Sequence, residues 1–252
     1  MFEIIDVHNG NVDEKGFFCM RSKPKSKGYQ NKLAWLKQRF QEDLKLKIIE
    51  EDGQPKGFIE YMPSEVAWRG INGNNYLIIH CLWIVGRGKG KGYGSKLLEA
   101  CINDAKSQGK SGVAMITSSE TWLADKSFFM KFGFESVEQA SPCFELIVKR
   151  FDEEPIPRFN VGWDERASEY IEGITILKSD QCPYIEDAVK MILEVAEERS
   201  IQSQVIDLTD CEQAQSAPSA YGVFNVILNG RVLTYHPVTK REFNKLLDMS
   251  GV

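Results

Sequence analysis

The stretch GRGKGKGYGSKLLEA, Gly86 to Ala100, holds five glycines and three basic residues in its first nine positions and continues as a helix. It directly follows YLIIHCLWIV, Tyr76 to Val85, a run apolar on both faces that is typical of a central, buried strand. Glycines let backbone N–H groups approach a ligand closely. The helix N-terminus adds free donors and a positive dipole end. The sequence therefore predicts a polyanion site, most simply for a pyrophosphate.

The glycine spacing excludes the two common nucleotide-binding loops. A Walker A loop needs Gly, four residues and then Gly-Lys-Ser or Gly-Lys-Thr, and no register here supplies that order. A Rossmann loop needs G-x-G-x-x-G. In the four possible registers its last glycine falls on Lys91, Tyr93, Ser95 or Leu97.

Composition limits the class of protein. The 252 residues are 42% hydrophobic and 27% charged, which suits one large or two modest globular domains. No apolar run reaches the roughly 18 residues of a membrane span, and MFEIIDVHNG at the N-terminus has no signal-peptide pattern. Six scattered cysteines without a C-x-x-C motif favour a reducing cytosol. We therefore expect a cytoplasmic protein without a membrane partner.

The charge balance divides the chain. Residues 1–150 carry 22 Lys and Arg against 18 Asp and Glu, whereas residues 151–252 carry 9 against 18. The acidic, proline-containing segment FDEEPIPRFNVGW, Phe151 to Trp163, has the chemistry of a linker. We expect domains at residues 1–150 and 164–252 joined by a linker at 151–163. No Lys/Arg stripe with interleaved aromatics is present, so no nucleic-acid partner is expected.

Hydrophobic periodicity predicts a mixed α/β fold in both halves. In the first half we expect strands at 2–7, 44–50, 57–62, 76–85, 113–117 and 145–149, and helices at 31–42, 95–107 and 125–132. In the second half we expect strands at 174–177, 204–208, 224–228 and 231–235, and helices at 186–198 and 239–247. Asn229-Gly230 between two apolar runs predicts a tight hairpin.

The glycine loop resembles the acetyl-coenzyme-A loop of the GCN5-related N-acetyltransferase (GNAT) family. That pattern is Arg or Gln, two residues, Gly, one residue, then Gly or Ala; the stretch from Lys89 to Gly94 matches it, with Lys89 in the first place. SFFMKFGFESV, Ser127 to Val137, resembles a later landmark of the family. The resemblance covers about residues 1–150. It implies a mostly antiparallel sheet flanked by helices, acetyl-CoA as co-substrate, and acetyl transfer to a primary amine of a small-molecule or peptide acceptor.

The resemblance also assigns a binding site for acetyl-CoA. The strand end would pair with the pantetheine arm, and its N–H groups near Ile84 and Val85 would polarise the thioester carbonyl. Phe129 stands where many members carry a Tyr that protonates the leaving thiolate, which Phe cannot do. The expected binding residues are Trp83, Ile84, Val85, Lys89, Gly90, Lys91, Gly92, Tyr93, Gly94, Ser95 and Phe129.

The general base has two candidates. The family position for a Glu falls on Ile78, and His80 should lie on the same strand face. A neutral His could take a proton from an ammonium acceptor, although His80 could equally be a core residue. Glu60 on the preceding strand is the alternative base, or else a solvated carboxylate. Cys81 is predicted to point to the opposite face and to pack there.

The family determines its acceptor with the first helical segment and the strand after it. Here Trp68 and Arg69 could contact an acceptor, and Arg69 would favour a carboxylate. Surface packing is the alternative role for this pair.

The second half resembles a thioredoxin-like fold, with the order strand, DQCPYI, helix, strand, hairpin, helix. Cys182-Pro183-Tyr184 stands where glutaredoxins carry Cys-Pro-Tyr-Cys, but Ile185 replaces the second Cys. Cys182 could be a reactive thiol, or a soft metal ligand with Cys211, and a cis-proline is expected near Pro218. A degenerate module for packing or substrate binding is the alternative. YGVFNVILNGRVLTYHPVTKREFNKLL, residues 221–247, resembles YoaP-type bacterial acetyltransferases.

Two further hypotheses therefore remain beside the enzyme. The chain could be a CoA-binding sensor or adaptor without catalysis, or a thiol- or metal-binding protein that acts through Cys182.

Overall fold

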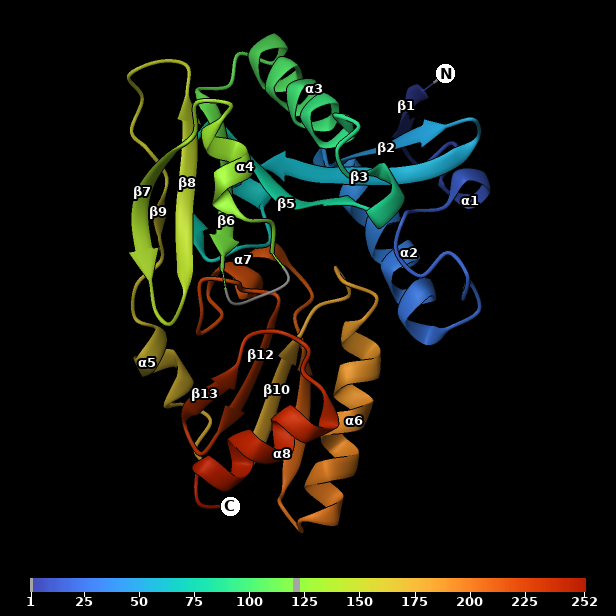
Figure 1. Ribbon diagram of the computed structural model, residues 1–252. Coiled ribbons are helices and arrows are strands. Elements are labelled where there is room, and N and C mark those ends of the chain that lie inside the picture. The colour runs from blue at the N-terminus through green and yellow to red at the C-terminus, as the bar shows by residue number, and fades with distance from the viewer. Residues whose placement is uncertain (1, 120–122) are drawn as a thin grey trace. The chain divides into compact units, whose positions relative to one another are not determined.

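The computed structural model describes residues 2–119 and 123–252, which form two compact units (Figure 1). The first unit comprises Met1–Arg21, Leu33–Ala67 and Ile71–Phe159, and the second comprises Ser22–Lys32, Trp68–Gly70 and Asn160–Val252. The chain thus leaves the first unit at Phe159, within the segment 151–163. No sequence pattern predicts that the two short early segments, Ser22–Lys32 and Trp68–Gly70, group with the second unit.

The first unit is built on one seven-stranded sheet. Its order is β1 (Phe2–Val7), β2 (Lys45–Glu51), β3 (Gln54–Pro63), β5 (Tyr76–Ile84), β6 (Gly112–Ser118), β8 (Phe144–Arg150) and β7 (Glu135–Ala140). All neighbours are antiparallel except β5 and β6, which are parallel. This confirms the mixed, mostly antiparallel sheet. The edge strand β7 was not predicted, because ESVEQA carries a single large apolar residue.

Helices and short turns connect these strands. They are α1 (Val12–Lys15), α2 (Lys27–Arg39), α3 (Tyr93–Ser107) and α4 (Lys126–Met130), with 3₁₀ turns at Phe40–Glu42, Ser64–Val66 and Gly86–Gly88. A two-residue ladder joins β4 (Ile71–Asn72) to β9 (Arg158–Phe159). Helix α2 starts four residues before the predicted 31–42 segment, with Ser26 Oγ accepting from the N–H of Tyr29 at 3.4 Å.

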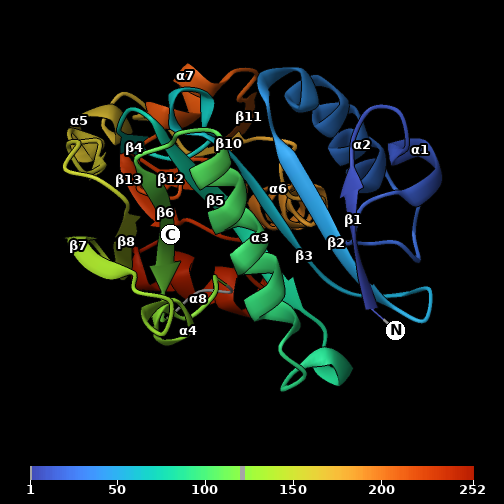
Figure 2. The ribbon, with the colours of Figure 1, turned by 90° about the horizontal axis from the view of Figure 1, so that it is seen from above.

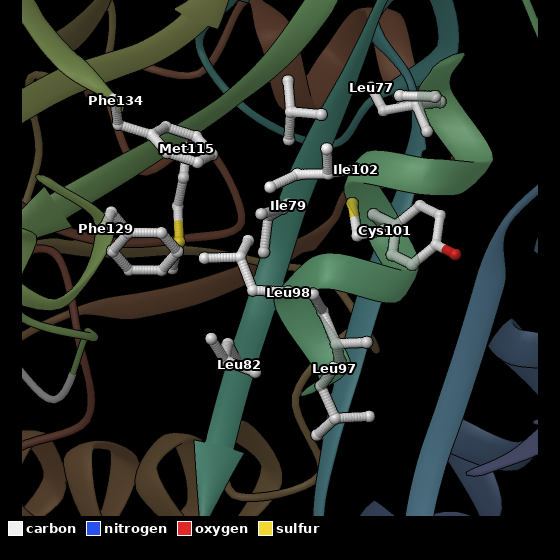
Figure 3. Packing of buried hydrophobic residues seen from close by; sticks show 14 of the residues in the cluster. Leu77, Ile79, Leu82, Leu97, Leu98, Cys101, Ile102, Met115, Phe129 and Phe134 are labelled. Atoms are coloured by element: carbon white, nitrogen blue, oxygen red, sulfur yellow. The ribbon is translucent and has the colours of Figure 1, made fainter. Parts of the chain in front are cut away.

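The main core of the first unit lies between the sheet and α3, which crosses the middle strands (Figure 2). Leu97, Leu98, Cys101 and Ile102 of α3 face the strand β5 that precedes the glycine loop (Figure 3). On β5 the residues of this core are Leu77, Ile79 and Leu82. Helix α3 therefore covers one face of β5, and side chains of β5 that could act on a substrate must lie on the other face.

The second unit contains a four-stranded sheet in the order β11 (Ser203–Asp207), β10 (Ile174–Lys178), β12 (Phe224–Leu228) and β13 (Arg231–Thr234). Strand β10 is parallel to β11 and antiparallel to β12. The predicted hairpin is confirmed, because Asn229 and Gly230 join β12 to β13 with φ of 48° and 81°. The helices are α5 (Trp163–Ala167), α6 (Ile185–Glu198), α7 (Cys211–Gln215) and α8 (Lys240–Met249).

Helices α5 and α7 are each five residues long. Five residues are too few to show the hydrophobic repeat of a helix, so neither helix was predicted. The expectation of a cis-proline near Pro218 is wrong. Among the described residues the cis peptide bond is the one between Ser141 and Pro142.

Candidate active site

The glycine loop links β5 to α3 with two residues in the left-handed region. Gly90 and Gly92 have φ of 80° and 78°, and a Cβ added at either would meet nothing within 4 Å. Backbone conformation, rather than crowding, therefore requires glycine at both positions. Gly92 is the N-cap of α3, and no side chain caps the helix. The first N–H groups of α3 thus have no intrahelical acceptor and remain available to an anion.

A carboxylate on β2 holds this loop. Lys91 Nζ lies 2.9 and 3.2 Å from the two oxygens of Glu51, and the Tyr93 hydroxyl donates to the same carboxylate. The hydroxyl of Tyr93 and then the ammonium of Lys91 hold the pKa of Glu51 below its usual range. The hydrogen bond from Lys91 to Glu51 raises the pKa of Lys91. Sequence reasoning missed Glu51, because only the strand register brings residue 51 to the loop.

Strands β5 and β6 are paired along only part of their length. Their parallel register runs from Tyr76 opposite Gly112 to Ile79 opposite Met115 and ends there. Strand β5 continues to Ile84 and β6 to Ser118, so their C-terminal ends have no ladder between them. Beyond Ile79, one edge of β5 therefore offers backbone groups to something other than β6.

Strand alternation decides which amides face this open edge. The Val85 N–H donates to the Lys56 carbonyl at 2.9 Å, on the β3 side. In an antiparallel pair successive residues direct their N–H groups to opposite sides. Trp83, opposite Phe58 in the register, thus also faces β3, whereas Leu82 and Ile84 face the open edge. The amides of Ile84 and Val85 were expected to polarise a thioester. The Val85 amide is hydrogen-bonded to β3, whereas the amides of Leu82 and Ile84 face the open edge.

A one-residue bulge on β5 lies next to these amides. Glu60 is opposite Cys81 and Tyr61 is opposite Ile79, so His80 is the extra residue. His80 Nδ1 lies 3.4 Å from Glu60 Oε1, and these two residues are only 1% and 2% exposed. The two candidate bases are therefore one buried pair. Such contacts are often long in a free enzyme and shorten in the substrate complex.

The bulge also corrects the prediction for Cys81. Directly opposite residues of an antiparallel pair point to the same face. Because Cys81 is opposite Glu60, its side chain shares the face of Glu60 and His80, and Leu82 returns to the α3 face. The expected opposite face for Cys81 is wrong, because strict alternation does not continue through a bulge.

Phe129 lies in the hydrophobic core and is fully buried. Its ring makes edge contacts with Phe128 and Phe134, at centroid distances of 5.2 and 5.4 Å. The ring that meets the glycine loop is that of Phe128, 3.3 Å from the position of a Cβ on Gly94. Phe129 therefore packs against Phe128, the ring next to the glycine loop. A contact of Phe129 with acetyl-CoA stays a prediction.

Trp68 and Arg69 belong to the second unit and are buried, with 1% and 3% exposure, so surface packing does not describe them. Arg69 donates to Gln181 Oε1 at 2.5 Å and to the Trp68 carbonyl at 2.7 Å. Its guanidinium lies over the ring of Tyr221, 4.9 Å from the centroid. These contacts give Arg69 a structural role, and an acceptor contact stays a prediction.

Cys182 is half-buried, and its carbonyl accepts from the N–H of Ile185, the first residue of α6. None of the six cysteines, all of which lie in the described residues, forms a disulfide bond. Within residues 2–119 and 123–252, no group of three or more His, Cys, Asp or Glu side chains could hold a metal ion. In the same residues, no helix has the length and apolar character to cross a membrane.

Comparisons with known proteins place the chain in a family. Residues 15–134 match the model of the acetyltransferase (GNAT) family, and residues 203–245 match the YoaP-like model. The chain is 33% identical to the uncharacterized N-acetyltransferase YoaP of Bacillus subtilis (strain 168) over 250 residues, 97% of this chain and 98% of that protein. The chain belongs to the YoaP-type GNAT N-acetyltransferases. As a member of this family it is an acetyltransferase, and acetyl-CoA is its acetyl donor.

Two further comparisons cover less of the chain. The L-methionine sulfoximine/L-methionine sulfone acetyltransferase of Salmonella typhimurium is 31% identical over 80 residues, 32% of this chain and 44% of that enzyme. PaiA N-acetyltransferase from Thermoplasma acidophilum, solved in complex with coenzyme A, has a TM-score of 0.43 and 16% identity, covering 60% of this chain and 99% of that one.

Proposed function

We propose that this acetyltransferase acts on a primary amine of a small-molecule or peptide acceptor. The observation that carries the proposal is the end of the β5–β6 ladder at Ile79 and Met115, next to the buried pair of Glu60 and His80. The open edge offers amides for a thioester, and the pair offers a proton acceptor beside it.

The donor half of the site is backbone chemistry. The N–H groups at the start of α3 and the loop residues from Lys89 to Ser95 would hold the pyrophosphate of acetyl-CoA. Open space around Gly90 and Gly92 supports this fit, because phosphate oxygens can approach the chain there. The outward amides of Leu82 and Ile84 would stabilise negative charge on the thioester oxygen. Bound acetyl-CoA supplies an activated acetyl group that an amine can take directly.

The acceptor half of the site is side-chain chemistry. An ammonium must lose a proton before its nitrogen can attack. In the tautomer of His80 with hydrogen on Nδ1, which faces Glu60, Nε2 is the basic nitrogen and would accept that proton. The Glu60 carboxylate would then stabilise the imidazolium, as the acid of a catalytic triad does. Glu60 thus acts through His80 as a positioning residue.

The second unit we infer to be a thioredoxin-like module. Supporting this, β10 is central, parallel to β11 and antiparallel to β12, with a hairpin and a last helix following. Cys182 precedes α6 at the place of the first glutaredoxin cysteine. A reactive thiolate role predicts fast iodoacetamide labelling of Cys182 already near neutral pH, and labelling that starts only above about pH 8 contradicts it. A cytosolic location, expected from the free cysteines, is part of the same proposal.

Gly92→Glu tests the donor site, with Gly109→Glu as its matched control. The two glycines have φ of 78° and 65°, both lie in open space, and they stand at opposite ends of α3. The same strain therefore enters both variants, but only the first places a carboxylate where the pyrophosphate binds. In calorimetric titration with acetyl-CoA we expect at least about 100-fold weaker binding for Gly92→Glu, or ~2.7 kcal/mol. The control should bind like wild type.

Equal binding by all three proteins would contradict the assignment of the loop. Release of free CoA with a panel of primary amines, followed by thiol titration, tests the reaction itself. Acetyl-CoA binding without release on any amine would contradict the amine acceptor while leaving the donor site in place.

A further inference from the structure

The face of β3 and β5 opposite α3 carries a row of aromatic side chains beside the buried pair. Phe58 and Trp83 are directly opposite each other in the register, and Glu60 and Cys81 form the next pair of this face. Directly opposite residues share a face. The α3 face holds Ile59 and Leu82 instead, so this row lies on the opposite face of the same two strands, where Glu60 and His80 are buried.

The aromatic row extends beyond the two strands. The ring of Phe18, from the segment between α1 and α2, stacks on Phe58 with a centroid distance of 5.3 Å and an interplanar angle of 25°. Phe58 itself is buried, with 5% exposure. Trp83, next to this stack, is 46% exposed. A large ring left open at the splayed end of β5 gives a flat apolar molecule a surface to cover.

The direction of attack selects this face. Helix α3 covers the other face of β5, so a nucleophile reaches a thioester at the open edge from the side of His80 and Glu60. On that side, the carboxylate of Glu60 attracts a cation. Aromatic ring faces attract a cation as well. Charge and shape therefore both favour an ammonium group attached to a flat apolar body.

We propose that the acceptor is a primary amine on an aromatic body, which stacks on Trp83 while its nitrogen points to the pair of His80 and Glu60. This rests on the amine acetyltransferase function proposed above. Neighbouring positions on one strand face are about 7 Å apart, and between Trp83 and His80 this face holds Cys81. A short spacer between ring and nitrogen lets the nitrogen extend past the indole toward the pair, and a spacer of two carbons is the one tested. Trp83 thus determines specificity through its side chain, and its backbone is engaged with β3.

The test uses the full chain, saturating acetyl-CoA and three probes: 2-phenylethylamine, ethylamine and phenylalanine. CoA release is followed with a thiol reagent. We expect kcat/KM for 2-phenylethylamine to exceed that for ethylamine by at least about 30-fold, as burial of a ring allows. Phenylalanine, which adds a carboxylate near Glu60, should be a poorer substrate than 2-phenylethylamine.

Trp83→Ala should raise KM for 2-phenylethylamine at least about tenfold with little change in kcat, so the ratio of kcat/KM for 2-phenylethylamine to that for ethylamine should fall. Trp83→Phe should restore most of the preference. Calorimetry with acetyl-CoA reports whether either variant has lost its fold or its donor site.

Equal kcat/KM for 2-phenylethylamine and ethylamine in the wild type would overturn the inference and leave the amine acetyltransferase function standing. So would a preference that survives Trp83→Ala while acetyl-CoA still binds. No release with any of the three amines would count against both the acceptor class and the inference.

Discussion

The two sides of the β5 open edge are built in opposite ways. On the donor side the proposed functional groups are backbone amides of the glycine loop, the start of α3 and the open edge of β5. On the acceptor side the proposed groups are the side chains of Glu60 and His80, which lie at a one-residue bulge. Backbone chemistry tolerates any sequence that folds the same way. Side-chain chemistry depends on one register shift.

This difference teaches which half of an active site a sequence discloses. A loop of alternating glycines after an apolar strand has a direct physical meaning, because few residues adopt positive φ. A His on an apolar strand has no such meaning, since its partner depends on pairing with another strand. The acceptor side is therefore where substitutions should discriminate most.

The largest effect is expected from His80→Ala, with His8→Ala as control because the exposed His8 begins the turn that leads into α1. Loss of a general base should lower kcat at least about tenfold while acetyl-CoA binding holds. The measurement is steady-state CoA release beside calorimetry. If the rate is unchanged, the base is Glu60 or water. The acceptor side would then not depend on the side chain of His80.

Glu60→Gln keeps the shape of that pair and removes its charge, and it should cost less than His80→Ala. Without the carboxylate the imidazolium is less stable, so the acidic limb of the kcat profile should move to lower pH. A merely structural Glu60 would lower stability without moving that limb. The pH–rate profile of the variant, beside its thermal midpoint, distinguishes the two roles.

The smallest effect is expected on the donor side, from Glu51→Gln. The pKa of Glu51 is lowered and that of Lys91 is raised, so both groups are charged at any pH between these two pKa values. Their ion pair is lost when the pH falls below the pKa of Glu51 or rises above the pKa of Lys91. At neutral pH the substitution removes a negative charge beside the loop. Acetyl-CoA should bind about two- to fivefold more tightly at low salt, with the gain fading at high salt.

Weaker binding by Glu51→Gln would mean that holding the loop in place outweighs the repulsion between Glu51 and the phosphates. The donor side would then also depend on one side chain, and the comparison between the two sides would lose its contrast.

Most elements of the fold could be predicted, because strong periodicity marks them. The strand at 224–228 and the hairpin at Asn229 and Gly230 match the structure, and the helix after the glycine loop begins at Tyr93 rather than Ser95. Strand β7 was missed because it carries a single large apolar residue and forms by pairing with β8.

The site was only partly predictable. The loop positions followed from glycine chemistry, whereas the direction of the Val85 amide and the partner of Lys91 depend on strand pairing. Likewise, the buried surroundings of Arg69 include Gln181 and Tyr221, more than a hundred residues later in the chain. No local pattern contains that information.

The bulge at His80 separates the position of the proposed base from the packing of the core. Because His80 is the extra residue of β5, deleting it would leave Cys81 opposite Glu60 and would restore strict alternation. Leu82 would keep its place in the α3 core, and Trp83 would keep its face. A gene that loses this one codon would therefore encode a protein with its core in register and the proposed general base gone.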